Sequence, residues 1–481
     1  MSVLENLGPE KVYQFFEEIC NIPHGSTNLD RISSYLEKFA SDRGLWHVRD
    51  ASNNVIIIKE ATPGYEDVEP IILQGHMDMV AVKKPDCDID LWNDPLRLKV
   101  DGDYIYAEGT SLGGDDGIAV AYALAILDSD DIKHPRIEVV ITTDEEIGME
   151  GATAIDLSML KAKRMLNIDS EEEGILLTSC AGGLRADCNI PVAREQKDGQ
   201  FYRIEVGGLT GGHSGAEINK ERGNAIKLLA RVLGTVQESV ELQIADIGGG
   251  EKDNAIPREA FALVCVSEQA VQVLEDKINE LDAILKNENQ TKEKNLYVKI
   301  SMTAEEQKSV LTTEATNRVI SFLMALPNGI MNMSMDIAGL VETSLNVGVL
   351  ELKEDMLVSK SALRSSIETA KLYLLKQVEN VAKLVGGSIE TSGDYPGWQY
   401  NPDSKLRNQM IEIYKEMFHK EPQVEALHAG LECGIMIAKI PGLDCVSFGP
   451  DILDIHTTEE RLSVSSTNRM WDYLLEILAR K

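Results

Sequence analysis

Several features that mark other classes of protein are missing from this sequence. The seven cysteines are odd in number and scattered, with no C-x-x-C spacing. That pattern favours reduced thiols and a cytoplasmic protein over a disulfide framework or a structural zinc knot. No apolar run is long enough to span a bilayer. The N-terminal residues predict a helix rather than a signal peptide.

Basic residues are also scarce. Lysine and arginine number 47 against 79 acidic residues, which gives a formal net charge of -32. Such a field repels phosphate backbones and anionic membranes, so we expect neither nucleic acid nor membrane as a partner. A length of 481 residues with 43% hydrophobic content predicts two or three domains with packed cores.

The pattern of strands and helices divides the chain. At both ends, buried strands alternate with helices, which predicts an α/β domain with a mainly parallel sheet, and residues 101–107 predict one of its short strands. The middle predicts an α+β sandwich whose order resembles one βαββαβ unit used twice. We therefore expect a first domain in two parts, 1–185 and 395–481, with a second domain, 186–394, inserted between them.

Histidine and acidic residues follow the buried strands of the first domain at their carboxyl ends. In open α/β sheets this edge is where ligands bind. A further acid in a glycine-rich loop, just before a buried helix, could reach the same edge. The residues are His76, Glu145, Glu146, Asp169 and His456 after strands, and Asp115 in the loop.

These residue types predict a metal site. Two histidines and several carboxylates without cysteine suit Zn²⁺ or Mn²⁺ better than a soft metal. The carboxylates are too many for one tetrahedral zinc, which favours two metals sharing one carboxylate. Asp78 lies on the same strand face as His76, where it can hold the imidazole in one tautomer. Taken singly, each acid could be a helix cap or a solvated loop charge.

The order of the motifs resembles the co-catalytic di-zinc aminopeptidase and carboxypeptidase superfamily. The inserted domain and a late H-A-G-L-E-C-G motif make the sequence most similar to the aminoacyl-histidine dipeptidase branch, which is also called Xaa-His dipeptidase, peptidase D or cytosolic non-specific dipeptidase. The motifs are H-x-D at 76–78, G-G-D-D at 113–116, D-E-E at 144–146, Asp169, G-G-H-S-G at 211–215, H-A-G-L-E-C-G at 428–434 and His456.

The resemblance implies a catalytic first domain that binds two Zn²⁺ ions per chain, with Mn²⁺ or Co²⁺ as substitutes. Asp115 would bridge the metals. One site would be completed by His76 and Asp169 and the other by Glu146 and His456.

In the same resemblance Glu145 is the general base and Asp78 orients His76. One departure is Asp116, where this branch usually carries asparagine, and it leaves open which aspartate bridges.

The inserted domain resembles the lid of this branch. His213 corresponds to a histidine that stabilises the oxyanion, although a loop histidine between turn glycines is the alternative. Asn254 and Arg364 resemble lid residues that hold the substrate, and a guanidinium suits a free carboxylate; the alternative for Arg364 is a surface salt bridge. His428 and Glu432 would line the pocket near the substrate's N-terminus, or serve loop and helix-start chemistry.

The expected function is a di-zinc metallodipeptidase that hydrolyses Xaa-His and related dipeptides through a metal-bridged water activated by Glu145. An amidohydrolase or aminotripeptidase of the same superfamily is one alternative, and a non-catalytic binding protein on this fold is a second. The partner is a small peptide substrate. A homodimer through the lid is common in the superfamily, but a doubled lid could satisfy that edge within one chain.

Overall fold

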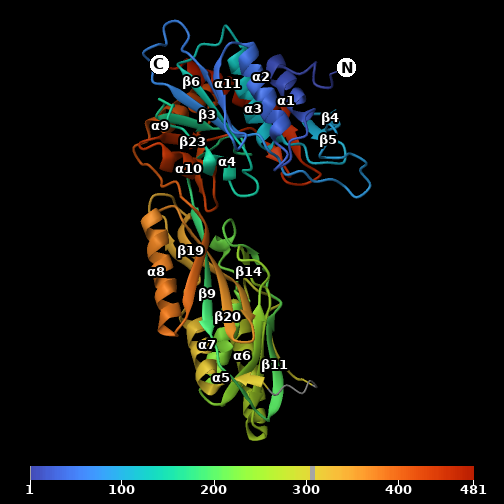
Figure 1. Cartoon of the computed structure of the whole chain (residues 1–481), viewed down its shortest axis with the longest axis vertical. Helices are drawn as coiled ribbons and strands as arrows, with labels where there is room; N and C mark the ends of the chain where they lie inside the picture. The colour runs from blue at the N-terminus through green and yellow to red at the C-terminus, as the bar shows by residue number, and fades with distance from the viewer. Residues whose placement is uncertain (1, 304–308) are drawn as a thin grey trace. The chain divides into compact units, whose positions relative to one another are not determined.

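The computed structural model describes residues 2–303 and 309–481 and forms two compact units (Figure 1). The first unit comprises Met1–Ser179, Tyr400–Ala426 and Leu431–Lys481, and the second comprises Cys180–Gln399 and Leu427–Gly430. The unit boundaries fall within six residues of the predicted domain boundaries. The sequence placed Leu427–Gly430 in the first domain, whereas the structure groups this segment with the second unit.

The first unit contains an eight-stranded sheet in the order β1-β2-β6-β3-β7-β23-β8-β22. Only the central β6, β3, β7 and β23 run parallel; β1, β2 and β8 pair antiparallel. The predicted parallel sheet is therefore its centre, and the whole sheet is mixed. The strands are β1 Trp46–Arg49, β2 Val55–Lys59, β3 Ile71–His76, β6 Ile137–Thr142, β7 Arg164–Asn167, β8 Ile175–Cys180, β22 Gln423–Leu427 and β23 Asp444–Ser447.

Helices cover this sheet, and one hydrophobic core joins five of them to inward-facing strand residues such as Ile57 and Leu73. Alternate residues of a strand point to opposite faces, so the intervening Ile56 and Ile72 are buried on the other side. The helices of the shared core are α1 Glu10–Cys20, α2 Asp30–Asp42, α3 Gly114–Asp128, α9 Lys405–Phe418 and α11 Val464–Ala479; α4 Glu150–Ala154 packs with α10 Glu432–Lys439.

A four-stranded sheet completes the first unit. The sequence predicted one strand over residues 101–107, and this is wrong: β4 Leu98–Asp101 and β5 Tyr104–Ala107 form a hairpin. Gly102 between them has a φ of 59°, a left-handed conformation that a tight turn requires and glycine adopts readily. The remaining strands are β24 Ile452–Leu453 and β25 Arg461–Ser463.

The second unit is a sheet with helices packed on it. Helix α8 packs against β9 and β20, α5 against β13 and β19, and α6 against β16. The main strands are β9 Gly182–Pro191, β11 Gln200–Gly207, β13 Leu242–Gly249, β15 Ala260–Val266, β16 Tyr297–Met302, β19 Val341–Leu352, β20 Met356–Ser365 and β21 Ser388–Tyr395; the helices are α5 Ala225–Gln237, α6 Val271–Asn289, α7 Thr313–Ala325 and α8 Glu368–Leu384. The short strands are β10 Arg194–Gln196, β12 Gly212–His213, β14 Ala255–Ile256, β17 Ser309–Leu311 and β18 Gly329–Met333.

This sheet has two halves, β16-β11-β15-β13 and β19-β20-β9-β21, joined where β13 pairs with β19. Each half follows the βαββαβ order. The sequence did not predict β9, which pairs with β20 and β21 and supplies the first strand of the second half. The first half is thus inserted between β9 and α7. Among the described residues, no helix is long and apolar enough to cross a membrane.

Candidate metal centre and active site

The central parallel strands bring the predicted ligands to one edge of the first unit's sheet. His76 is the last residue of β3, Glu145 and Glu146 follow β6, and Asp169 follows β7. His456 lies beyond β23 in the chain. Because neighbouring parallel strands end at the same edge, their following residues converge, which is the placement that the sequence predicted.

The candidate ligand atoms lie around two histidines, and Asp115 is close to both. His76 Nε2 lies 3.2 Å from Asp115 Oδ1 and 3.4 Å from Asp169 Oδ1. His456 Nε2 lies 3.2 Å from Asp115 Oδ2 and 2.9 Å from Glu146 Oε1. Each oxygen of Asp115 therefore faces a different histidine, which is the arrangement that a carboxylate shared between two metals requires.

The electrostatics of these groups fit divalent cations. Hydrogen bonds with Asp115 and Glu146 raise the pKa of His456 to about 10. Burial lowers the pKa of His76, but the carboxylates of Asp169 and Asp115 outweigh it and raise that pKa well above its usual value. In the absence of metal, the carboxylates thus favour a proton on each imidazole. Metal cations can take the place of those protons and leave neutral ring nitrogens as ligands.

Asp116 has a different environment from Asp115. Its Oδ2 accepts a hydrogen bond from the His76 backbone N–H at 3.1 Å. Burial, with the nearby charge of Asp169, raises the pKa of Asp116 well above its usual value. Three sets of side chains have atoms close enough together to hold one ion: Asp115 with Glu146 and His456, His76 with Asp116 and Asp169, and His76 with Glu145 and Glu146. We favour Asp115 as the shared carboxylate because only its two oxygens face both histidines.

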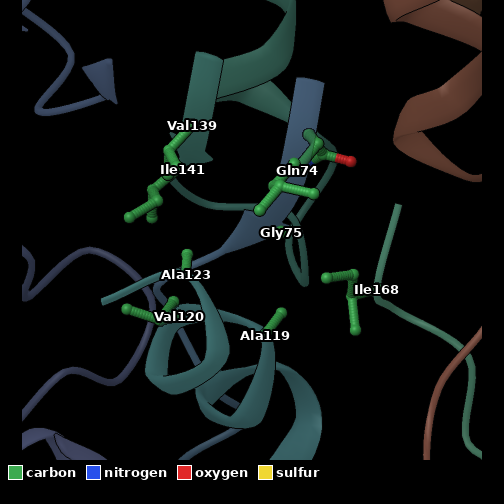
Figure 2. Close-up of a pocket in the computed structure, with 9 residues that line it drawn as sticks. Gln74, Gly75, Ala119, Val120, Ala123, Val139, Ile141 and Ile168 are labelled. Carbon is green, nitrogen blue, oxygen red and sulfur yellow. The ribbon is translucent and has the colours of Figure 1, made fainter. Parts of the chain in front are cut away.

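Glycine at position 75 allows α3 to approach β3 closely. A Cβ atom there would lie 2.4 Å from Asp116 Oδ2 and 2.7 Å from Ala119 Cβ. Figure 2 shows the small side chains of Ala119 and Ala123 on the helix side of an interior pocket that Gly75 also lines. The short helix–strand distance places the acidic start of α3 beside His76.

Asp78 organises more of the site than the sequence predicted. His76 Nδ1 lies 2.9 Å from the backbone oxygen of Asp78 and 3.4 Å from its carboxylate. The same carboxylate accepts hydrogen bonds from Ser26 Oγ at 2.8 Å and from the Glu145 N–H at 3.1 Å. It therefore connects the His76 end of β3 to the turn that carries Glu145 and Glu146.

Glu145 lies in a strongly negative environment. Burial raises its pKa to about 9; the charges of Asp169 and Glu432 act in the same direction, and His76 opposes them. A general base at neutral pH must be ionised. Divalent cations held by the neighbouring ligands would favour the ionised carboxylate, so the proposed base depends on the metals beside it.

In the second unit, His213 and Arg364 both lie close to Gly215, since a Cβ there would be 3.0 Å from the His213 ring and 3.2 Å from the guanidinium carbon. His213 Nδ1 accepts hydrogen bonds from the N–H groups of Gly215 at 3.2 Å and Ala216 at 3.1 Å. Nε2 is therefore the nitrogen that carries the proton. Burial and the charge of Arg364 lower the pKa of His213, so the ring is a neutral donor.

Arg364 is not a surface cation. Its side chain is 9% exposed, and its Nη1 donates a hydrogen bond to Tyr395 Oη at 3.2 Å. The guanidinium Nε is buried without a hydrogen-bond partner in residues 2–303 and 309–481. This burial differs from the surface salt bridge considered from the sequence.

The other predicted substrate residues have internal partners. The backbone oxygen of Asn254 accepts a hydrogen bond from the Ser214 N–H at 2.8 Å, which fixes the loop beside His213. His428 Nε2 lies 2.7 Å from Ser344 Oγ in the second unit, and burial with the charge of Arg364 lowers the pKa of His428 to about 3.

Glu432, four residues beyond His428, belongs to the first unit and is fully buried. Its carboxylate accepts hydrogen bonds from Gln74 and from Thr142 Oγ1 at 2.6 Å, and burial raises its pKa to about 8. A direct contact with substrate stays a prediction for Asn254, His428 and Glu432.

The histidines and carboxylates at the ends of the parallel strands are a set of donors that suits divalent metal ions. Residues 72–480 match the peptidase family M20/M25/M40. The chain is 39% identical to the cytosol non-specific dipeptidase of Escherichia coli K12 over 480 residues, 99% of either chain. This chain belongs to the peptidase family M20/M25/M40, so it is an enzyme that hydrolyses peptide bonds, and the resemblance predicted from its motifs is confirmed.

Solved structures agree with this assignment. The aminoacylhistidine dipeptidase from Vibrio alginolyticus superposes with a TM-score of 0.95 at 37% identity, covering 99% of this chain and 98% of that one. The aminopeptidase PepT from Bacillus cereus gives a TM-score of 0.57 at 16% identity, covering 98% of each chain, and shows the fold alone. The predicted fold class is confirmed.

Proposed function

We propose that this chain is a cytoplasmic di-zinc dipeptidase that hydrolyses Xaa-His and related dipeptides. The observation that carries the proposal is Asp115, whose two oxygens each face a different histidine–carboxylate group. The names of the Escherichia coli and Vibrio alginolyticus relatives support a dipeptide substrate. Scattered cysteines, with no disulfide among the described residues, support the cytoplasmic location.

The residues of the first unit would act as follows. His76, Asp169 and Asp115 would hold one zinc, and Asp115, Glu146 and His456 would hold the other; Mn²⁺ or Co²⁺ would suit the same donors. Bound zinc supplies a Lewis acid that polarises a carbonyl and makes water more acidic. Glu145 accepts the proton of the attacking water and returns it to the leaving amine.

The residues of the second unit would recognise the peptide. The proton on His213 Nε2 is a donor for the oxyanion that forms as the carbonyl is attacked. Arg364 would bind the free C-terminal carboxylate, because a guanidinium matches that group with two parallel hydrogen bonds. Its buried, unpaired Nε supports this role.

Arg364→Lys should lower kcat/KM for dipeptides about 10–100-fold, since loss of a directional contact to a charged group costs about 1.5–3 kcal/mol. Steady-state kinetics on a dipeptide and on its C-terminal amide check this. Amidation should damage the wild type about as much as the substitution does. The two changes together should be less than additive, because both remove the same contact.

His213→Ala is the comparison variant. Its loss should fall mainly in kcat, because an oxyanion exists only in the transition state. If dipeptide amides were cleaved as well as free dipeptides, Arg364 would not be the carboxylate-binding residue.

A substrate panel tests the function itself. The zinc-loaded enzyme is offered Xaa-His dipeptides, tripeptides and N-acylated amino acids at equal concentration. Free dipeptides should give the highest kcat/KM. Faster cleavage of tripeptides would favour an aminotripeptidase, and faster cleavage of N-acylated amino acids would favour an amidohydrolase.

A homodimer through the second unit stays a prediction. The pairing of β13 with β19 joins two βαββαβ halves within one chain. This pairing supports the alternative in which the edge strand of one half is paired by the other half of the same chain rather than by a second copy.

A further inference from the structure

Glu460 binds the loop that carries Asp115. Its side chain is buried, and its carboxylate accepts hydrogen bonds from three consecutive N–H groups: Leu112 at 2.8 Å, Gly113 at 3.1 Å and Gly114 at 2.8 Å. The Asp115 N–H lies 3.4 Å from the same carboxylate. These donors lie at the start of α3. The first N–H groups of a helix have no partner within the helix, and together with the helix dipole they favour a negative charge nearby. The loop conformation is thereby tied to one side chain.

The same residue lies close to His456 in the chain. Only three residues separate them, and this segment is held as a turn: Thr457 Oγ1 donates to the Asp454 oxygen at 2.7 Å, and the Glu460 N–H lies 3.4 Å from the Thr457 oxygen. His456 itself has a left-handed φ of 60°. Glu460 therefore joins the two segments that carry Asp115 and His456, whose side chains lie 3.2 Å apart.

We propose that Glu460 is a positioning residue for the metal centre. Through the loop at the start of α3, it holds Asp115 at the distance from His456 that the metal between them needs. This inference rests on the proposed function, because it assumes that both residues are ligands. Glu460 contacts no reacting atom and acts through the backbone of its neighbours.

A carboxylate with the length of glutamate suits this role. Its Oε2 accepts from Leu112 and Gly113 and its Oε1 from Gly114, whereas a glutamine would present only one oxygen and would turn an NH₂ group toward N–H donors. The two glycines let the loop close around the side chain. Gly113 has a φ of 71°, and a Cβ on Gly114 would already lie 3.4 Å from Glu460 Oε1.

Glu460→Gln should weaken binding of the zinc between Asp115 and His456. Residues that orient metal ligands typically contribute 10–100-fold to metal affinity, so we expect the dissociation constant of this zinc to rise about 10–100-fold. Chelator competition on the folded protein measures this value, and the visible spectrum of the Co²⁺-loaded protein should shift with the changed ligand geometry. Glu459→Gln is the matched control, because its exposed carboxylate pairs with Lys84 at 2.6 Å.

If Glu460 only stabilised the fold, Glu460→Gln would lower the free energy of unfolding. It would not change the zinc affinity or the Co²⁺ spectrum of the folded protein. That result would overturn the proposal, as would an equal loss of affinity in Glu459→Gln. If Glu460→Gln does not fold, Glu460→Asp keeps both oxygens on a shorter side chain. It should also weaken zinc binding, and an unchanged affinity would overturn the proposal.

Measurements on the wild-type protein distinguish a failure of the positioning inference from a failure of the proposed function. If it binds two zinc ions and cleaves dipeptides while Glu460→Gln binds zinc equally well, only the positioning inference fails. If the wild type binds fewer than two, the proposed function fails first.

Discussion

Replacing Asp115 with alanine is expected to abolish peptidase activity and to reduce the metal content well below two ions per chain. Each oxygen of this carboxylate faces a different histidine at 3.2 Å. Its removal takes a ligand from both proposed sites. The two metal ions would then repel each other without the negative carboxylate that offsets their charge. Elemental analysis and a dipeptide assay on the same preparation measure both effects.

The matched control is Asp130→Ala, because Asp130 is exposed beyond the far end of α3. It should keep both metals and full activity. An Asp115→Ala protein that retained activity, or two ions per chain, would show that another carboxylate is shared. Asp116 would then be the next to test, since it can group with His76 and Asp169.

Glu145→Gln should lower kcat by on the order of 10²–10⁴, the usual contribution of a general base, while the metal content stays near that of the wild type. The amide keeps the size of the side chain but cannot accept the proton of the attacking water. Glu146→Gln should instead lower metal occupancy, because Glu146 Oε1 lies 2.9 Å from His456 Nε2.

The two substitutions are the same chemical change at adjacent positions, so each is the control for the other. Metal analysis, together with kcat at saturating zinc, distinguishes a missing base from a missing ligand. If Glu145→Gln lost metal and Glu146→Gln kept it, the two assignments would have to be exchanged.

The clustering of the candidate ligands could be predicted because most of these residues follow strand ends. A buried, β-branched strand such as β6 is visible in the sequence, and parallel strands end at one edge, so Glu145 and His76 could be placed together without coordinates. The motif order supplied the rest. The antiparallel flanks and β9 could not be predicted in this way, since β9 is short of β-branched residues and derives its place from pairing with β20 and β21.

Supporting contacts were not predictable for a different reason. Glu460 is one of 79 acidic residues, and nothing in its local sequence distinguishes it from Glu459. Its importance comes from four N–H groups more than 340 positions earlier in the chain. The second role of Asp78 has the same origin, because its contact with the Glu145 N–H depends on the packing of β3 beside β6.

The most direct test of the central claim is a zinc titration of the metal-stripped enzyme, in which bound zinc and hydrolysis of an Xaa-His dipeptide are measured at each step. Two histidine–carboxylate groups sharing Asp115 predict no activity without metal and a plateau at two zinc ions per chain. Full activity in the metal-free protein, or a plateau at one ion, would contradict this account.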